Sequence, residues 1–359
     1  MYRFIRALLF LLPAEAAHAL GMGALDLLSQ LPGVCRILRQ RALAKAPGLE
    51  VKIAGLTFAH PIALAAGLDK NADAVGGLFA LGFSGVEVGT VTPVAQAGNP
   101  RPRLFRLSAD SALINRMGFN NHGTSAMRDA LRGDVFRPGP LGINIGKNKD
   151  TPLEHAEDDY VACVEGLAPL ADYVVVNASS PNTPGLRALQ EPAELTRLLT
   201  AVRARMDAVA PGKALFLKFA PDLSSAALDA LVDVAVACRV DGLIATNTTL
   251  ARPVTHALAA EAGGLSGKPL RELSTSAIRR AYRRAQGRLA IIGVGGVFNA
   301  EDAYEKIRAG ASVIQVYSGF IYEGPPMIRR LLDGLVDLLH RDGFPDVASA
   351  VGTRASTGD

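Results

Sequence analysis

The sequence predicts an α/β fold, a (β/α)8 TIM barrel with an N-terminal two-helix amphipathic extension. Past residue 46, eight short apolar runs recur, and most are separated by an amphipathic helical stretch. Each run ends in a polar residue or a glycine pair, which is typical of strands that end at the mouth of an enzyme barrel. A doubly wound sheet is the competing fold, but it gives no reason for the alternation to stop at eight strands.

The expected strands leave room for a helix between most neighbours. They are Ile62–Ala66, Val86–Gly89, Leu141–Ile145, Tyr173–Val176, Leu215–Phe219, Leu243–Thr246, Ile291–Val294 and Val313–Tyr317. The helical stretches include Asp158–Ala168, Glu194–Ala208, Ala226–Cys238, Thr275–Arg284 and Ala300–Arg308. The interval from Thr90 to Pro140 has little helical pattern, and its segment Pro100–Arg106 predicts a small β excursion that covers the barrel mouth.

Composition excludes several classes of protein. The net charge of +4 over 359 residues, with no block of lysines or arginines, does not favour a nucleic-acid partner. Cys35, Cys163 and Cys238 are far apart, which argues for a reducing compartment and against disulfides or structural zinc. The six histidines show no ligand spacing, so we expect no metal.

The first 44 residues form a separate apolar and basic segment. Its start resembles a secretory signal peptide, but the apolar run Ala7–Leu12 is short and apolar positions recur beyond it. We expect two short helices, broken near Pro13 and Pro32, neither reaching the roughly 20 apolar residues that span a bilayer. The segment suits an amphipathic hairpin on anionic lipid, or a helical extension that covers the barrel bottom. The barrel then runs over residues 45–343, followed by a tail, 344–359, whose last residues from Val351 lack apolar periodicity and predict disorder.

The polar strand ends predict a ligand site. The stretch from Asn177 to Gly185 places carboxamides and hydroxyls after an apolar strand, although a plain turn would use similar residues. Gly293–Gly296 and Tyr317–Gly319 end the last two strands, where barrels hold a phosphate, and Gly263–Gly267 adds a third glycine-rich loop. Lys218 lies near the end of another expected strand. A lysine at this place is a Schiff-base nucleophile, an anion-binding residue or the partner of a cofactor that becomes negative during turnover.

Nine ordered motifs resemble the dihydroorotate dehydrogenase family over nearly the whole chain. They are Ala66–Lys70, Val88–Pro93, Asn115–Asn121, Asn144–Asn148, Asn177–Gly185, Lys218–Asp222, Ala245–Thr249, Gly264–Gly267 and Tyr317–Gly319. Ser180 stands where this family has its catalytic base. A serine there, together with the N-terminal extension, resembles the membrane-associated, quinone-dependent class, since the soluble classes use cysteine and lack the extension.

The resemblance implies an activity and a set of site residues. Ser180 would remove the C5 proton of (S)-dihydroorotate while hydride passes from C6 to FMN, and a relay through Thr248 or Thr183 would assist it. The implied substrate-binding residues are Lys70, Asn115, Arg116, Met117, Gly118, Phe119, Asn177, Asn182, Asn247 and Thr248. The implied FMN-binding residues are Ala66, Gly67, Lys70, Thr90, Asn144, Asn177, Lys218, Thr246, Gly267, Gly296, Tyr317 and Ser318.

In the second half-reaction a membrane quinone would reoxidise the flavin. His18 and Arg106 match polar residues of the family's quinone tunnel, which lies under the N-terminal helices. The resemblance thus implies one FMN per subunit, dihydroorotate or orotate and a quinone as ligands, a monomer, and a peripheral place on the cytoplasmic side of the cell membrane. The fourth step of de novo pyrimidine biosynthesis is the implied role.

Three alternatives remain at this stage. A barrel of the tRNA dihydrouridine synthase type would need a cysteine acid near the flavin and a basic RNA-binding domain, and the sequence has neither. A membrane scaffold without activity does not explain eight polar strand ends. A soluble dihydroorotate dehydrogenase linked to fumarate or NAD is the strongest rival, and it predicts no quinone activity.

Overall fold

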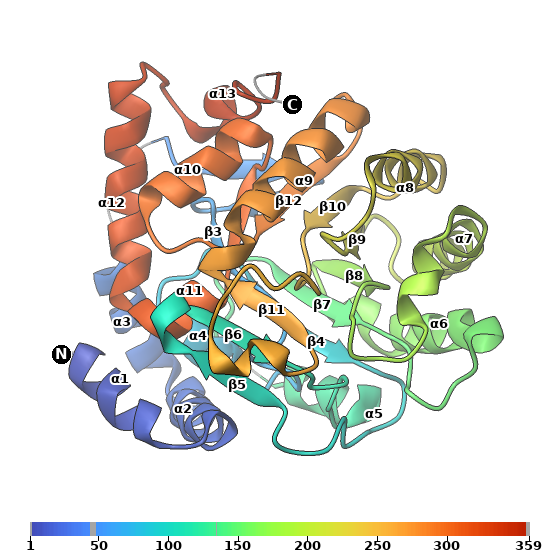
Figure 1. The fold of residues 1–359 in the computed structure, drawn as a ribbon, viewed down its shortest axis with the longest axis horizontal. Coiled ribbons are helices and arrows are strands. Elements are labelled where there is room, and N and C mark those ends of the chain that lie inside the picture. Colours follow the sequence, from blue (N-terminus) through green and yellow to red (C-terminus); the bar gives the residue numbers. More distant parts are fainter. Residues whose placement is uncertain (1, 44–47, 134, 357–359) are drawn as a thin grey trace.

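A computed structural model describes residues 2–43, 48–133 and 135–356 of the protein (Figure 1). Eight parallel strands close into a barrel in the order β10-β12-β13-β3-β4-β7-β8-β9. The predicted barrel and all eight strands are confirmed, with ends that shift by two residues at most. The strands are β3 (Ile62–Leu64), β4 (Val86–Val91), β7 (Leu141–Ile145), β8 (Tyr173–Asn177), β9 (Ala214–Phe219), β10 (Gly242–Ala245), β12 (Ala290–Val294) and β13 (Val313–Val316).

These strands are buried on both faces, which explains why they read as continuous runs of Val, Ile and Leu. Helices surround the barrel and cover its outer face (Figure 1). They are α4 (Val75–Ala80), α5 (Gly123–Leu131), α6 (Ala156–Leu167), α7 (Pro192–Val209), α8 (Ser225–Ala237), α9 (Arg271–Ala285), α10 (Ala300–Ala309), α11 (Ser318–Glu323) and α12 (Pro326–Arg341). Their starts have physical causes: Ser224 caps α8, and Asn299 with Asp302 forms a capping box at α10.

Two small sheets lie outside the barrel. A hairpin of β1 (Val51–Ile53) and β2 (Leu56–Phe58) precedes the first barrel strand. The predicted β excursion is confirmed as β5 (Leu104–Leu107) and β6 (Ala112–Asn115). A third strand, β11 (Gly264–Gly267), pairs with β6 although about 150 residues separate them in the chain, and sequence pattern did not indicate this pairing.

The N-terminal extension contains three helices instead of the predicted two: α1 (Tyr2–Leu11), α2 (Ala14–Ser29) and α3 (Pro32–Ala42). The breaks at Pro13 and Pro32 are where we expected them, and Pro32 begins a further helix because proline is well tolerated in the first turn. Glu15 of α2 forms an ion pair with Arg103, 3.0 Å away in the excursion between β4 and β7. The start of α2 therefore adjoins the barrel mouth, whereas the alternative placed the extension over the bottom.

The chain after residue 343 packs on the barrel as far as the structure describes it. In a short helix, α13 (Val347–Ala350), the amide of Val347 donates to Gly48 O at 3.0 Å. Farther on, the amides of Gly352 and Arg354 donate to carbonyls of α10, and Ala355 is buried. Residues 351–356 thus differ from the expected disorder because backbone bonds, which leave no apolar pattern, hold them. Residues 357–359 lie outside the described range.

Candidate active site

A cavity lies where the carboxyl ends of the barrel strands meet the β5-β6-β11 sheet and α2. It is lined by Ser180 and His18, and by most of the other predicted residues. Those from the substrate set are Lys70, Asn115, Met117, Gly118, Phe119, Asn177, Asn182, Asn247 and Thr248. Those from the cofactor set are Ala66, Gly67, Thr90, Lys218, Thr246, Gly267, Gly296, Tyr317 and Ser318. Arg116, Asn144 and Arg106 are not part of this lining.

Asn144 lies beneath the cavity floor, fully buried. Its Oδ1 accepts hydrogen bonds from Thr90 Oγ1 at 2.5 Å and from Asn177 Nδ2 at 3.1 Å. Asn177 Nδ2 also donates to Thr90 Oγ1 at 2.9 Å. Asn144 therefore orients two lining residues from beneath the floor, and its role in FMN binding stays a prediction.

Glu87 and Gln315 are buried barrel residues that the sequence analysis missed. Glu87 Oε1 accepts from Asn144 Nδ2 at 2.8 Å and lies 3.9 Å from Lys218 Nζ, and its Oε2 accepts from Gln315 Nε2 at 2.5 Å. Burial lowers the pKa of Lys218, whereas the Glu87 carboxylate raises it. The carboxylate thus favours the ammonium form, which suits an anion partner better than a Schiff-base nucleophile. The sequence did contain a sign of this site, because Glu87 is a charged residue inside the apolar run of β4.

The loops after β11, β12 and β13 line the cavity with glycine, apolar and hydroxyl residues and with their backbone groups. Gly267, Gly295 and Gly296 have φ of 98°, 124° and 73°, a region that favours glycine. A Cβ added at Gly296 would lie 2.6 Å from Arg271 Cα, so this approach requires glycine as well. The only lysines among the described lining residues, Lys70 and Lys218, come from other strands. These loops form a cradle whose N–H groups fit an anionic group such as a phosphate.

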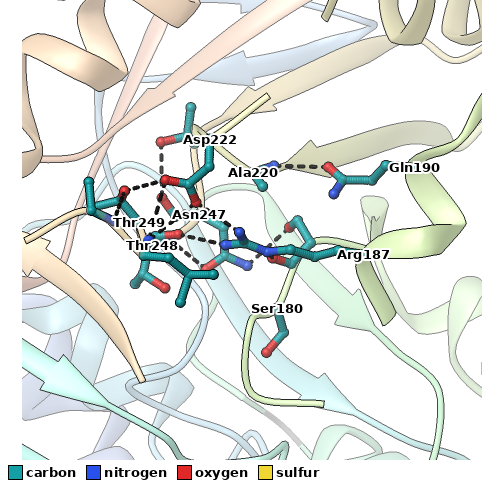
Figure 2. Close-up of polar contacts among 12 residues, drawn as sticks. Ser180, Arg187, Gln190, Ala220, Asp222, Asn247, Thr248 and Thr249 are labelled. Carbon is teal, nitrogen blue, oxygen red and sulfur yellow. Dashed lines mark hydrogen bonds and ion pairs between the residues drawn. The ribbon is translucent and has the colours of Figure 1, made fainter. Parts of the chain in front are cut away.

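Ser180 lies on the loop after β8, and a single guanidinium ties this loop to two others (Figure 2). Arg187 Nε donates to Ser179 O at 3.2 Å, and its Nη2 donates to Thr248 O at 3.2 Å. Its Nη1 forms a 2.8 Å ion pair with Asp222, which follows β9. Arg187 thereby connects the loops after β8, β9 and β10. Sequence analysis did not single out this pair, although Asp222 lies in a quoted motif.

The carboxamides of the cavity are linked to one another. Asn182 Nδ2 donates to Asn115 Oδ1 at 3.3 Å, and Asn247 Nδ2 donates to Ser179 Oγ at 3.0 Å. Thr248 lines the cavity, and its Oγ1 is buried and has no hydrogen-bond partner within the described chain. A buried hydroxyl without a partner is costly, so it fits a polar ligand bound beside it.

Two titratable groups on the side of the N-terminal helices have shifted pKa values. Burial lowers the pKa of Lys70 to about 8, with Arg103 lowering it further and Asp69 and Glu15 opposing the shift. Burial and the nearby Lys70 lower the pKa of His18 to about 4. His18 is therefore neutral at pH 7 and can both donate and accept a hydrogen bond.

The two remaining arginines have other partners. Arg106 donates to the carbonyls of Leu9 and Leu12, which end α1, and its guanidinium lies 4.6 Å from the ring centroid of Phe10. Arg116 forms a 2.6 Å ion pair with Glu261. Neither side chain belongs to the cavity lining, because each is held by a helix end or a neighbouring loop. Their roles in quinone and substrate binding stay predictions.

Comparison with known proteins gives consistent matches. A family model described as dihydroorotate dehydrogenase matches residues 48–339. A Myxococcus xanthus protein named dihydroorotate dehydrogenase (quinone) is 64% identical over 353 residues, 98% of this chain and 97% of that protein. An Acidithiobacillus ferrooxidans protein of the same name is 50% identical over 362 residues, 99% of each chain. The crystal structure of DHODH from Eimeria tenella with ferulenol has a TM-score of 0.81 at 40% identity, covering 89% of this chain and 94% of that one. The chain therefore belongs to the dihydroorotate dehydrogenase family.

Proposed function

We propose that this protein oxidises (S)-dihydroorotate to orotate with FMN and passes the electrons to a membrane quinone. This reaction is the fourth step of de novo pyrimidine biosynthesis. The observation that carries the proposal is a single cavity shared by the strand-end carboxamides, Ser180 and His18 of the N-terminal extension. A soluble enzyme of this family would have no reason to bring such an extension to the edge of its site.

The residues of the cavity fit FMN in two respects. The glycine cradle supplies backbone donors for a phosphate, and the Lys218 ammonium is buried with its nearest carboxylate 3.9 Å away. When bound, FMN supplies a hydride acceptor for the substrate and an electron donor for the quinone. Lys218 would stabilise negative charge on the cofactor, while the glycine cradle, Tyr317 and Ser318 would hold its phosphate end.

Ser180 would take the proton from C5 of the substrate. Its Oγ accepts a hydrogen bond from the amide of Asn182 at 3.2 Å, which stabilises developing negative charge on the oxygen. Asn115, Asn177, Asn182 and Asn247 would read the pyrimidine edges, because a carboxamide offers both a donor and an acceptor. Thr248, whose hydroxyl has no partner within the described chain, and Thr183 remain the two candidates for a proton relay.

The test is anaerobic reduction of the purified yellow protein by dihydroorotate, followed by decylubiquinone or fumarate. We expect the flavin to bleach and then to be reoxidised by the quinone. Reoxidation by fumarate alone would keep the reaction but contradict the quinone assignment and the role of His18. A protein without flavin, or a flavin that dihydroorotate does not bleach, would overturn the proposal.

The N-terminal helices are also proposed to bind the membrane surface as part of a monomeric, peripheral protein on the cytoplasmic side. In the described chain, ten of the thirteen exposed large apolar side chains lie between Phe4 and Ile37. Phe4, Leu8 and Leu11 of α1 are 68–82% exposed. No helix of the described chain is long and apolar enough to span a bilayer. An exposed apolar face of this kind suits insertion into the interface.

Charged substitutions should test this surface. The double change Leu8→Glu and Leu11→Glu is expected to lower partitioning onto anionic vesicles more than tenfold, because both side chains would leave the acyl boundary. Co-sedimentation with vesicles measures the effect. Val94→Glu is the matched control, since Val94 is as exposed as Leu8 but lies outside the extension. Equal partitioning of all variants would contradict the proposed surface.

Arg187 is expected to act as a positioning residue for Ser180 and Thr248. Arg187→Gln should slow flavin reduction by dihydroorotate about 10- to 100-fold, since small misplacements of reacting groups have effects of this size. Reoxidation by quinone should change less than twofold. Stopped-flow absorbance measures both half-reactions, with Arg197→Gln, which removes exposed ion pairs on α7, as control. An equal loss in both half-reactions would indicate general damage to the fold.

A further inference from the structure

Lys306 is a buried cation that the proposed reaction does not use. It lies on α10, and its side chain is fully buried. Its Nζ donates to Ser274 Oγ at 2.8 Å, Thr275 Oγ1 at 2.9 Å and Arg271 O at 3.3 Å. All three partners are neutral oxygens, and no ion pair within 4 Å is recorded for it in the described chain. A buried ammonium without an adjacent anion is costly, so its presence calls for a physical reason.

None of the charged groups that face this ammonium forms an ion pair with it, and several of them pair with one another. Arg271 and Glu272 lie on α9, and Asp302 and Glu305 lie on α10. Arg271 forms ion pairs with Asp302 at 2.9 Å and with Glu272 at 2.7 Å. Burial lowers the pKa of Lys306 to about 7, although the carboxylates oppose this shift. The site is therefore short of negative charge around the ammonium.

The ammonium lies directly behind the glycine cradle. Its partner Ser274 also donates to Val294 O at 2.6 Å, at the end of β12. A Cβ added at Gly295 would lie 3.0 Å from Ser274 Oγ, and one added at Gly296 would lie 2.6 Å from Arg271 Cα. Two of the three residues that accept hydrogen bonds from the ammonium, Ser274 and Arg271, are thus residues against which the glycine pair packs. Ser274 and Arg271 therefore lie between the cation and the glycine pair.

A phosphate monoester bound in the cradle would carry close to two negative charges at neutral pH. The cradle supplies N–H dipoles, while the lysines of the described lining come from other strands. We propose that Lys306 stabilises the bound FMN phosphate from behind the cradle, through its charge and without contact. The inference rests on the proposed function, and it assigns the missing cation of the phosphate site to a buried residue of α10.

The test measures the preference of the holoenzyme for FMN over riboflavin, which lacks the phosphate. Holoenzyme is incubated with a mixture of both flavins until exchange is complete, free flavin is removed, and the bound flavins are quantified by chromatography. Lys306→Gln removes the charge but retains a side-chain donor for Ser274 and Thr275. We expect this variant to lower the preference for FMN over riboflavin by a factor of about ten or more. The reason is that attraction between the Lys306 ammonium and the phosphate is only weakly screened in the protein interior. Lys213→Met, at a half-buried ion pair with Asp172 away from the cradle, should leave the ratio unchanged.

A purely structural role for Lys306 would weaken both flavins equally and leave the ratio within twofold, which would overturn the inference. If the variant does not fold, the unmodified holoenzyme provides a second measurement. Its preference for FMN should fall as the pH rises from 7 to 10, since the ammonium loses its proton while the phosphate remains a dianion. A constant ratio over this range would contradict the proposal. Failure of the proposed function is distinguishable, because the unmodified protein would then hold no flavin or would not be bleached by dihydroorotate.

Discussion

Ser180→Ala is expected to slow reduction of the bound flavin by dihydroorotate by a factor of about 10²–10⁴, the range typical for removal of a general base. Ser180 lines the cavity, and its Oγ already accepts an N–H hydrogen bond, so the oxygen is placed to hold negative charge. The flavin content and the rate of reoxidation by quinone should remain unchanged, because neither depends on removal of the C5 proton. Stopped-flow reduction under anaerobic conditions measures the effect.

The neighbouring hydroxyl provides a matched control. Ser179 is also buried, but its Oγ donates to Asn177 Oδ1 at 3.0 Å and does not line the cavity. Ser179→Ala removes this bond and the one that Ser179 Oγ accepts from Asn247 Nδ2, so it should cost no more than about thirtyfold, since each hydrogen bond contributes about 1 kcal/mol. Equal losses in the two variants would contradict the assignment of Ser180 as the base. Retention of full activity by Ser180→Ala would contradict it as well.

Glu87→Gln is expected to lower the free energy of unfolding of the holoenzyme by about 3 kcal/mol, the lower end of the range for breaking a buried ion pair. Two effects contribute. The substitution leaves the Lys218 ammonium buried without its carboxylate, and it places an amide N–H₂ against a donor of Asn144 or Gln315. Loss of the carboxylate should also lower the pKa of Lys218 further. A thermal scan of the holoenzyme should show a Tm that is lower by roughly 4 °C, because a chain of 359 residues has a large entropy of unfolding.

Two further variants serve as controls for the effect of Glu87→Gln on stability. Glu50→Gln breaks the Lys52–Glu50 pair, in which both side chains are largely exposed, and it should shift Tm very little. The double variant Glu87→Gln with Lys218→Met should be less destabilised than the sum of the two single variants, because the stranded charge is then absent. Additive effects would mean that the two groups do not interact through their charges.

Much of the protein was predictable from local pattern. The eight strands are buried on both faces, so each appears as an uninterrupted apolar run with a polar end, and the polar ends identify one face of the barrel. Pro13 and Pro32 mark helix boundaries because proline restricts the backbone wherever it stands. The family motifs then assigned roles to individual residues such as Ser180 and Lys218, roles which remain to be measured.

What local pattern did not reveal was the set of supporting contacts. No distinctive motif surrounds Glu87, Arg187 or Lys306 in the sequence. The partners of these three residues lie far away in the chain. The family resemblance assigned Asn144 to FMN binding, but only the packing shows that its amide also orients Thr90 and Asn177. The third N-terminal helix, α3, packs against α4, and residues 351–356 are held by backbone hydrogen bonds to α10.

The sequence by itself determined the barrel, the strand ends that meet in one cavity, and the family to which the motifs are similar. Periodicity and turn chemistry are properties of neighbouring residues, so these features could be predicted without coordinates. Only the tertiary structure decided which charges lie together: Lys218 with Glu87, Arg187 with Asp222, and Lys306 behind the glycine cradle. The physical reason is that electrostatic partners are selected by distance in space and by burial, and neither quantity can be calculated from the local order of residues.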